Sequence, residues 1–332
     1  VREIPGFLAL LVTYVVLIIK EHRLAALSIL FLGAGVMLTG LLPSFSGLIF
    51  TTLVMSFGFH YYETCNQSLT LQYFDKLSSP HVFSMQGSFA AAANVIVGIV
   101  IFFIAPRLSY QAIYLLFGIV ICACALWAFT RTPEKEGMPR QKKKMVLKKK
   151  YWLFYFLTFM AGARRQIFIA FAVFLLVKKF SFSVQEVTLL FLINNIINFF
   201  INPLIGKFIV RYGERKLLSL EYFFLILVFI SYATVDSKTL VGILYVADHI
   251  LFSFATGIKT YFQKIAEPED IAPSAAVGFT INHIAAVVLP LIGGLLWMVD
   301  YKIPFLAGAG FSAVSLCLVQ FIRTSVEDNS QT

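Results

Sequence analysis

Two adjacent arginines lie in the middle of a long apolar segment. Arg164 and Arg165 are near the centre of the run from 151 to 177. A helix of that length rises about 40 Å and can cross a bilayer, where a central arginine costs about 2.5–3.5 kcal/mol even on lenient scales. These side chains should therefore face protein, water or an anion. Because they lie about 100° apart on a helix, only one can point straight into a cavity. Guanidinium groups bind carboxylate or phosphate, so the favoured ligand is an anionic or zwitterionic solute.

A second apolar run, 46–73, carries polar residues along one helical face. His60, Glu63 and Gln67 are spaced by three and four residues, which places them on the same side of a helix. His60 beside Glu63 could load and release a proton, because an imidazole titrates near neutral pH. Two other interpretations stay open: a fixed ion pair between Glu63 and one of the arginines, or direct contact with the solute. We place Gln67 in the solute-binding cavity.

The run from 239 to 262 poses the same choice. Asp248 and Lys259 lie on one helical face, with His249 at its edge. Asp248 and His249 are a second candidate pair for proton coupling, and Lys259 is a candidate for solute binding. A structural ion pair between Asp248 and a neighbouring cation is the alternative, because ionisable groups inside a membrane usually pair with one another.

Asparagines form a polar stripe on a further run, 187–210. The stripe consists of Asn194, Asn195, Asn198 and Asn202. Hydrogen bonding between helices is the main interpretation, since asparagine commonly joins membrane helices. Solute binding by Asn198 is the alternative.

The composition of the chain is that of a membrane protein with several spans. Of its 332 residues, 59% are hydrophobic and only 13% are charged, and the mean hydropathy is +0.84. A soluble domain of this length needs more polar surface. The four cysteines all lie inside apolar runs. We find no metal-ligand spacing, nucleophile motif or phosphate-binding glycine loop, and therefore expect no metal, no other cofactor and no direct use of ATP.

Eleven apolar runs are long enough to cross a membrane, which predicts an all-α membrane protein. Turn residues such as Pro43, Pro106 and Asp236 separate them. The runs are 3–19, 24–42, 46–73, 83–105, 109–130, 151–177, 187–210, 217–235, 239–262, 274–299 and 303–322.

Positive charge is concentrated in one short loop. The net charge is +10, and residues 131–150 alone hold nine lysines and arginines against two glutamates. A basic loop between two spans is explained by the positive-inside rule rather than by nucleic-acid binding. We therefore expect this loop and the C-terminus to lie in the cytoplasm, in a multi-pass protein of the cell membrane.

An internal repeat divides the chain into two halves. At an offset of 188 residues, Tyr73-Phe74 coincides with Tyr261-Phe262, and Lys76 coincides with Lys264. Two parallel repeats of six spans are the plan of one large transporter class. The register leaves the first half without a counterpart of the arginine helix, so twelve spans are expected in a full-length protein. The expected domains are an N-terminal bundle at 1–130 that lacks its first span, a basic linker at 131–150, a C-terminal six-helix bundle at 151–323 and a cytoplasmic tail at 324–332.

The turn after the 187–210 run carries a recognisable motif. It comprises Gly206, Arg211, Gly213, Arg215 and Lys216. This pattern resembles the cytoplasmic motif of the major facilitator superfamily, in which it latches neighbouring helices during alternating access. The family's acidic position is Val210 in this chain, which puts a standard latch in doubt.

The resemblance implies a fold and a function. It implies two pseudo-symmetric helical bundles around a central cavity, lined here by the helices at 46–73, 151–177 and 239–262. We predict a secondary active transporter, a monomer in the lipid bilayer, that moves a small organic solute by alternating access with proton coupling. A non-transporting assembly factor or receptor with the same fold is the alternative, and the loss of the acidic residue at Val210 favours it slightly. We do not expect an enzyme.

Overall fold

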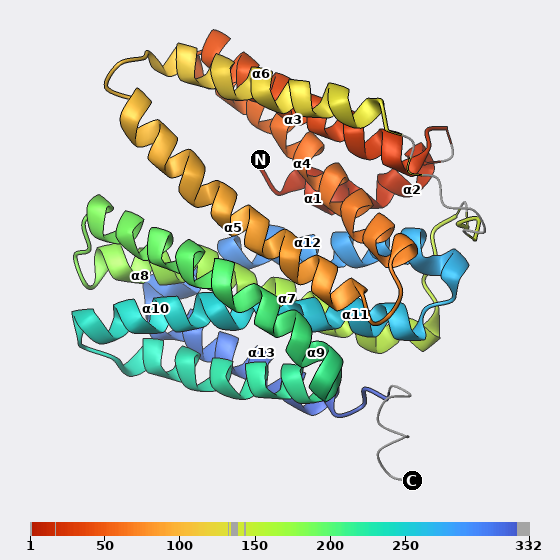
Figure 1. Ribbon diagram of the computed structural model, residues 1–332. Coiled ribbons are helices and arrows are strands. Elements are labelled where there is room, and N and C mark those ends of the chain that lie inside the picture. The colour runs from red at the N-terminus through yellow and green to blue at the C-terminus, as the bar shows by residue number, and fades with distance from the viewer. Residues whose placement is uncertain (1, 17, 132, 134–138, 143, 324–332) are drawn as a thin grey trace. The chain divides into compact units, whose positions relative to one another are not determined.

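The computed structural model describes residues 2–16, 18–131, 133, 139–142 and 144–323. Within these ranges every regular element is helical and no strand occurs, as the apolar runs predicted (Figure 1). The chain divides into two compact units. Unit 1 comprises residues 1–73, 96–147 and 266–283, and unit 2 comprises residues 74–95, 148–265 and 284–332. The domain boundaries expected from the repeat stay a prediction, and the tail at 324–332 lies outside the described residues.

Unit 1 is built on three long helices. Helix α3 (Glu21–Leu41) packs against both α4 (Phe45–Tyr73) and α6 (Tyr110–Phe129). The approach of α4 to α3 depends on Gly58, because a Cβ atom there would lie only 2.5 Å from the backbone nitrogen of Leu32. Small residues allow membrane helices to pack this closely.

Short helices precede these in unit 1. The elements α1 (Ile4–Phe7), η1 (Leu8–Leu11) and α2 (Val12–Val15) follow one another, and α1 and η1 pack against α4. The apolar run expected at 3–19 is therefore helical over a shorter stretch than a membrane-crossing helix needs.

The linker between the predicted bundles is held to the start of α12 (Ile271–Val299). Lys142 lies 2.7 Å from the buried carboxylate of Asp270 and 3.3 Å from Glu267. Its backbone N–H also donates to the carbonyl oxygen of Glu269. Part of the basic charge at 131–150 thus binds acidic residues of the chain itself.

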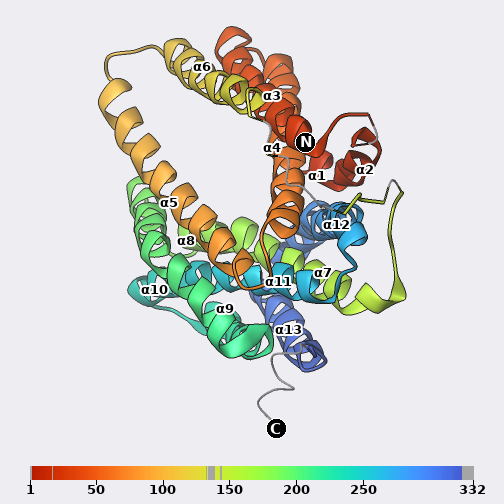
Figure 2. The same cartoon turned by 45° about the vertical axis from the view of Figure 1, so that its right-hand side comes forward.

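Unit 2 contains the arginine helix. Helix α7 (Trp152–Ile167) continues through a π-helical turn, η3 (Phe168–Ala172), into α8 (Val173–Lys178). Helix α13 (Lys302–Val319) packs against α7 and against α9 (Val184–Thr234). Figure 2 shows these helices from a second direction. A π-turn inside a membrane helix is notable because such turns concentrate at functional sites.

Helix α9 contains two predicted spans. The runs expected at 187–210 and 217–235 form one 51-residue element that is interrupted at Gly213, where φ is 79° and ψ is 161°. A residue with a side chain rarely adopts this conformation, so glycine permits the kink. The helix begins with a capping box in which Ser183 and Glu186 exchange hydrogen bonds with each other's backbone N–H.

The remaining spans of unit 2 follow α9. Helix α10 (Lys238–Phe252) passes through a short 3₁₀ turn, η4 (Ser253–Ala255), into α11 (Thr256–Ile265). Across the described residues, eight helices are long and apolar enough to cross a membrane. The kinked α9 is counted once among them. Helices α5 (Ser79–Ile104) and α12 each contribute residues to both units.

Candidate functional site

Arg164 is buried among polar partners within unit 2. Its side chain on α7 is only 3% exposed, and its guanidinium donates a hydrogen bond to the hydroxyl of Ser315 on α13. A second guanidinium nitrogen lies 3.6 Å from the carboxylate of Glu221 on α9, and the ring of Tyr222 lies 4.3 Å from the guanidinium carbon. Three helices therefore position this cation through an ion pair, a hydrogen bond and a cation–π contact.

A small cavity brings a second carboxylate to the same place. Asp248 of α10 is 2% exposed and lines the cavity together with Arg164 and Glu221. The cavity has about 10 Å³ of room for the centre of a water molecule, which is enough for about one water. The other lining residues are Ala161, Leu225, Phe252 and Ala255.

The charges around this cavity do not balance. Two carboxyl groups, Glu221 and Asp248, face one guanidinium, that of Arg164. One oxygen of each carboxyl group has no hydrogen-bond partner among the described residues. Burying an uncompensated carboxylate is expensive, so this arrangement favours binding of a proton or of a positively charged group.

The other candidates on α7, α10 and α11 do not join this cluster. Arg165 is half-buried and does not line the cavity. The ring of His249 lies 5.7 Å from that of Phe168 in the π-turn. The ammonium group of Lys259 lies 5.2 Å from the ring centre of Phe83 on α5. The expected pairing of Asp248 with His249 or Lys259 is therefore not the arrangement around the cavity, because the helical rotation of α10 turns Asp248 towards Arg164.

The asparagine stripe lies on the buried face of α9. Asn195 accepts a hydrogen bond of 2.8 Å from Asn94 of α5, which is the interhelical bond that the sequence suggested. Asn198 is buried and accepts a long hydrogen bond, 3.4 Å, from Ser253 in the turn between α10 and α11. These contacts favour a helix-joining role for the stripe.

The side chain of His60 contacts Glu3 and His283, which the sequence did not predict. Its Nε2 atom lies 3.8 Å from the carboxylate of Glu3, and its ring lies 4.8 Å from that of His283. Its Nδ1 atom is bonded to the carbonyl of Ser56, one turn earlier in α4, and no ion pair with Glu63 occurs among the described residues, so proton coupling through His60 and Glu63 stays a prediction.

Two further candidates on α4 are described in unit 1. Glu63 is half-buried and Gln67 is buried. Both lie on the helix predicted to line the cavity, and their roles in coupling and solute binding stay predictions.

The motif residues surround the kink of α9. A Cβ atom at Gly206 would lie 2.7 Å from the hydroxyl oxygen of Ser84, so this glycine permits close approach to α5. Gly213 provides the kink itself. Next to it, the fully buried Glu214 binds Lys264 at the end of α11 at 2.7 Å. Of the basic motif residues, Arg211 and Lys216 are exposed and Arg215 is half-buried.

Two acidic residues of these clusters were missed by sequence reasoning. Glu221 belongs to the run 217–235, which was treated only as an apolar span, although an acid inside a span is itself a signal of a buried polar site. Glu3 stands at the start of the first apolar run, where an acidic residue is unremarkable. Only the fold reveals that both are next to candidate residues.

Comparison with known proteins agrees with this architecture. The sequence matches the model of the Major Facilitator Superfamily over residues 4–262. The comparison with curated proteins found no match.

Several solved structures share the fold. The human organic anion transporter MFSD10 (TETRAN) has a TM-score of 0.79 at 12% identity, covering 96% of this chain and 82% of that one. The transporter FucP in its outward conformation has a TM-score of 0.75 at 10% identity, covering 97% and 87%. A variant of the E. coli fucose:proton symporter FucP has a TM-score of 0.73 at 11% identity, covering 98% and 88%. With the family match, these likenesses lead to one conclusion: the chain belongs to the Major Facilitator Superfamily and is an all-α, multi-pass membrane protein with that family's fold.

Proposed function

We propose that the protein is a secondary active transporter of a small organic solute, coupled to protons through the buried Arg164–Glu221–Asp248 cluster. The observation that carries the proposal is the surplus of one carboxyl group in that cluster. A proton on either carboxyl group removes the surplus charge, and deprotonation restores it. Such a change in buried charge is large enough to bias a helix arrangement between two states.

The position of the cluster supports a role in conformational change. Arg164 lies one turn before the π-helical segment η3, and Asp248 lies one turn before the 3₁₀ segment η4. Each functional side chain is therefore next to a place where the regular α-helical hydrogen bonding is interrupted. Interrupted helices near the membrane midplane are a common feature of transporter binding sites.

The mixed charge of the cluster suits a zwitterionic solute best. The cavity, which has room for about one water in this structure, would have to open; a solute amine would then meet Glu221 or Asp248, and a solute carboxylate would meet the guanidinium of Arg164. A purely anionic solute gains less here, because Arg164 is already engaged by Glu221 and Ser315. The proton in the name of the similar structure FucP, a fucose:proton symporter, fits the proposed coupling.

The alternative of a non-transporting assembly factor or receptor rests on Val210, which occupies the family's acidic motif position. The buried ion pair of Glu214 with Lys264 next to the kink argues against it. This pair can join α9 to α11 in one state and release them in another, which is the role that the missing acid would have served.

A test of the proton site does not require knowledge of the solute. Infrared difference spectra of the purified protein between high and low pH should contain a band from a protonated buried carboxyl group. The band should be lost in Asp248→Asn or in Glu221→Gln, and should persist in Glu269→Gln, which removes an exposed acid. An unchanged band in both buried-site variants would reject the cluster as the proton site.

Transport itself is tested in sealed proteoliposomes with a trapped pH-sensitive dye. A panel of amino acids and organic acids is applied with and without an imposed pH gradient. We expect solute-dependent proton movement in the unaltered protein and in Glu269→Gln, and its loss in Asp248→Asn. Solute uptake that continues at the same rate in Asp248→Asn, with the same dependence on pH, would contradict the proposed coupling.

A further inference from the structure

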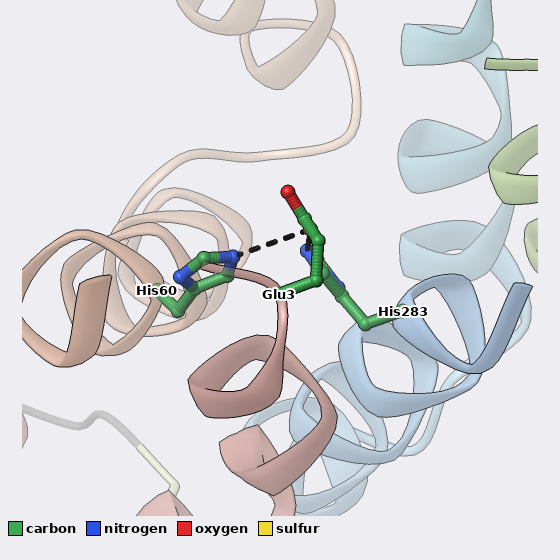
Figure 3. A group of neighbouring side chains, drawn as sticks. All are labelled: Glu3, His60 and His283. Atoms are coloured by element: carbon green, nitrogen blue, oxygen red, sulfur yellow. Dashed lines mark ion pairs between the residues drawn. The ribbon is translucent and has the colours of Figure 1, made fainter. Parts of the chain in front are cut away.

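Three side chains from distant parts of the sequence converge within unit 1. Glu3 precedes α1, His60 lies in the middle of α4 and His283 lies in α12 (Figure 3). The Glu3 carboxylate is 3.8 Å from Nε2 of His60 and 3.6 Å from Nε2 of His283. The nearest ligand atoms of all three residues lie within 4.8 Å of one another. The spacing of these residues in the sequence does not predict this cluster.

Both imidazoles are held in the orientation that a metal ligand requires. The Nδ1 atom of His60 lies 2.8 Å from the carbonyl oxygen of Ser56, and Nδ1 of His283 lies 2.8 Å from the carbonyl oxygen of Phe279. Because a carbonyl only accepts, each Nδ1 carries a hydrogen, and a ring without a second hydrogen presents the lone pair of Nε2 to a ligand. Metal-bound histidines usually make this same second hydrogen bond to a backbone carbonyl or a carboxylate.

The surrounding chain fixes the two rings in place. A side chain at Gly6 would collide with both imidazoles, so this glycine allows α1 to pass directly beside them. The ring of Phe279 stacks on that of His283 at 4.4 Å between centroids and meets the edge of His60 at 5.9 Å. Each histidine is only 2% exposed, whereas the Glu3 side chain is 31% exposed and gives access to the group.

We propose that Glu3, His60 and His283 form a binding site for one divalent transition-metal ion. With metal–ligand bonds of about 2.0–2.2 Å, the ligand atoms of a tetrahedral zinc site lie about 3.4 Å apart. The distances from the Glu3 carboxylate to the two Nε2 atoms exceed this value by only a few tenths of an ångström, and all the ligand atoms lie within 4.8 Å of one another, so side-chain rotations can bring them to one ion. Two imidazoles and one carboxylate, with a fourth position open to water, form a common set of ligands for a zinc ion.

The chemistry of the ligands selects the kind of ion. Imidazole nitrogen suits zinc, copper, iron and nickel, whereas magnesium and calcium prefer sites made only of oxygen. A proton would satisfy this group less completely. A proton bound to one imidazole forms one ion pair with Glu3, and the Nε2 lone pair of the other ring still faces the same carboxylate. A metal ion accepts electron pairs from all three groups at once.

The test is metal binding by the purified full chain, prepared without a histidine tag. Zn²⁺ binding is measured by calorimetry and by elemental analysis, and Co²⁺ serves as a spectroscopic probe because its visible absorption reports tetrahedral coordination. We expect one ion per chain. We expect His60→Gln and His283→Gln each to weaken Zn²⁺ binding at least tenfold and to abolish the Co²⁺ spectrum, since even partners of a metal ligand contribute about tenfold to a hundredfold.

The matched control is His81→Gln, which removes an exposed histidine at the start of α5. It should keep the affinity and the Co²⁺ spectrum of the unaltered protein. Size-exclusion profiles and thermal melting without metal establish that each variant is folded, and Glu3→Gln provides a milder third variant. The absence of stoichiometric Zn²⁺ binding, or equal binding by the His60→Gln/His283→Gln double variant, would overturn the proposal. Both results are independent of proton transport.

Discussion

The two buried polar clusters compensate their buried charged groups in different ways. In unit 2, Arg164 is a permanent cation that compensates one of two carboxyl groups, and helices α7, α9, α10 and α13 supply the members. In unit 1, the imidazoles of His60 and His283 each bond a backbone carbonyl through Nδ1 and turn Nε2 towards the carboxylate of Glu3. The first arrangement suits a proton or a charged solute, and the second suits a metal ion. The chemistry of a membrane site therefore depends on which charge is fixed, more than on how many polar groups are present.

The largest expected loss of stability follows from removing the guanidinium of Arg164. Arg164→Met leaves Glu221 and Asp248 buried without compensation, which should cost about 3–5 kcal/mol of unfolding free energy. Unfolding in mixed detergent micelles measures this value. The double variant Arg164→Met/Glu221→Gln should recover part of it, because it removes one of the two uncompensated acids. A single variant as stable as the unaltered protein would mean that Arg164 compensates nothing.

The next effect tests the packing of the other cluster. Gly6→Ala adds a methyl group that meets both imidazoles, and such overpacking costs about 1–3 kcal/mol. It should also weaken Zn²⁺ binding, because the rings must turn away. Gly98→Ala is the matched control, since a Cβ atom there meets nothing within 4 Å. If both variants bind Zn²⁺ equally well and are equally stable, α1 does not shape the site.

The next prediction compares the loss of one serine hydroxyl beside each cluster. Ser315→Ala removes the hydroxyl that accepts from Arg164, and loss of a hydrogen bond to a charged group costs about 1.5–3 kcal/mol. Ser56→Ala should cost only about 1 kcal/mol, because His60 keeps its bond to the carbonyl of residue 56. Unfolding free energies of the two variants check the order. The reverse order would show that the serine hydroxyl, rather than the backbone, orients His60.

The smallest effect belongs to an exposed ion pair outside the spans. Lys179 lies 2.9 Å from Asp236, and this hydrogen bond lowers the pKa of the Asp236 carboxyl. Folding lowers the pKa of the Asp236 carboxyl, so the ion pair stabilises the protein fully when the pH is above the ordinary pKa of 3.8. This stabilisation is lost as the pH falls through the pKa of the folded protein. The melting temperature of Asp236→Asn should be only slightly lower than that of the unaltered protein at neutral pH and equal to it in acid. A large difference that persists in acid would contradict this account.

Sequence reasoning identified the fold class, two members of the cluster in unit 2 and one member of the cluster in unit 1. An arginine in the middle of a membrane helix and an acid on a neighbouring span are conspicuous by their cost, so Arg164 and Asp248 could be found as candidates. Their partner Glu221 carried the same signal and was overlooked. The contact of His60 with Glu3 could not be predicted, because Glu3 is far from His60 in the sequence and only the packing of α1 against α4 brings the two side chains together.

The amino-acid sequence by itself determined the membrane character, most of the helical spans and the family. Hydrocarbon requires every backbone polar group to be hydrogen-bonded within the protein, and a long apolar helix meets that requirement within one segment, so the local order of residues predicts it. Only the tertiary structure decided which polar side chains meet. Glu3, His60 and His283 are brought together by the packing of α1, α4 and α12, and contacts between residues so far apart in the chain depend on helix rotation and close approach, which no local pattern specifies.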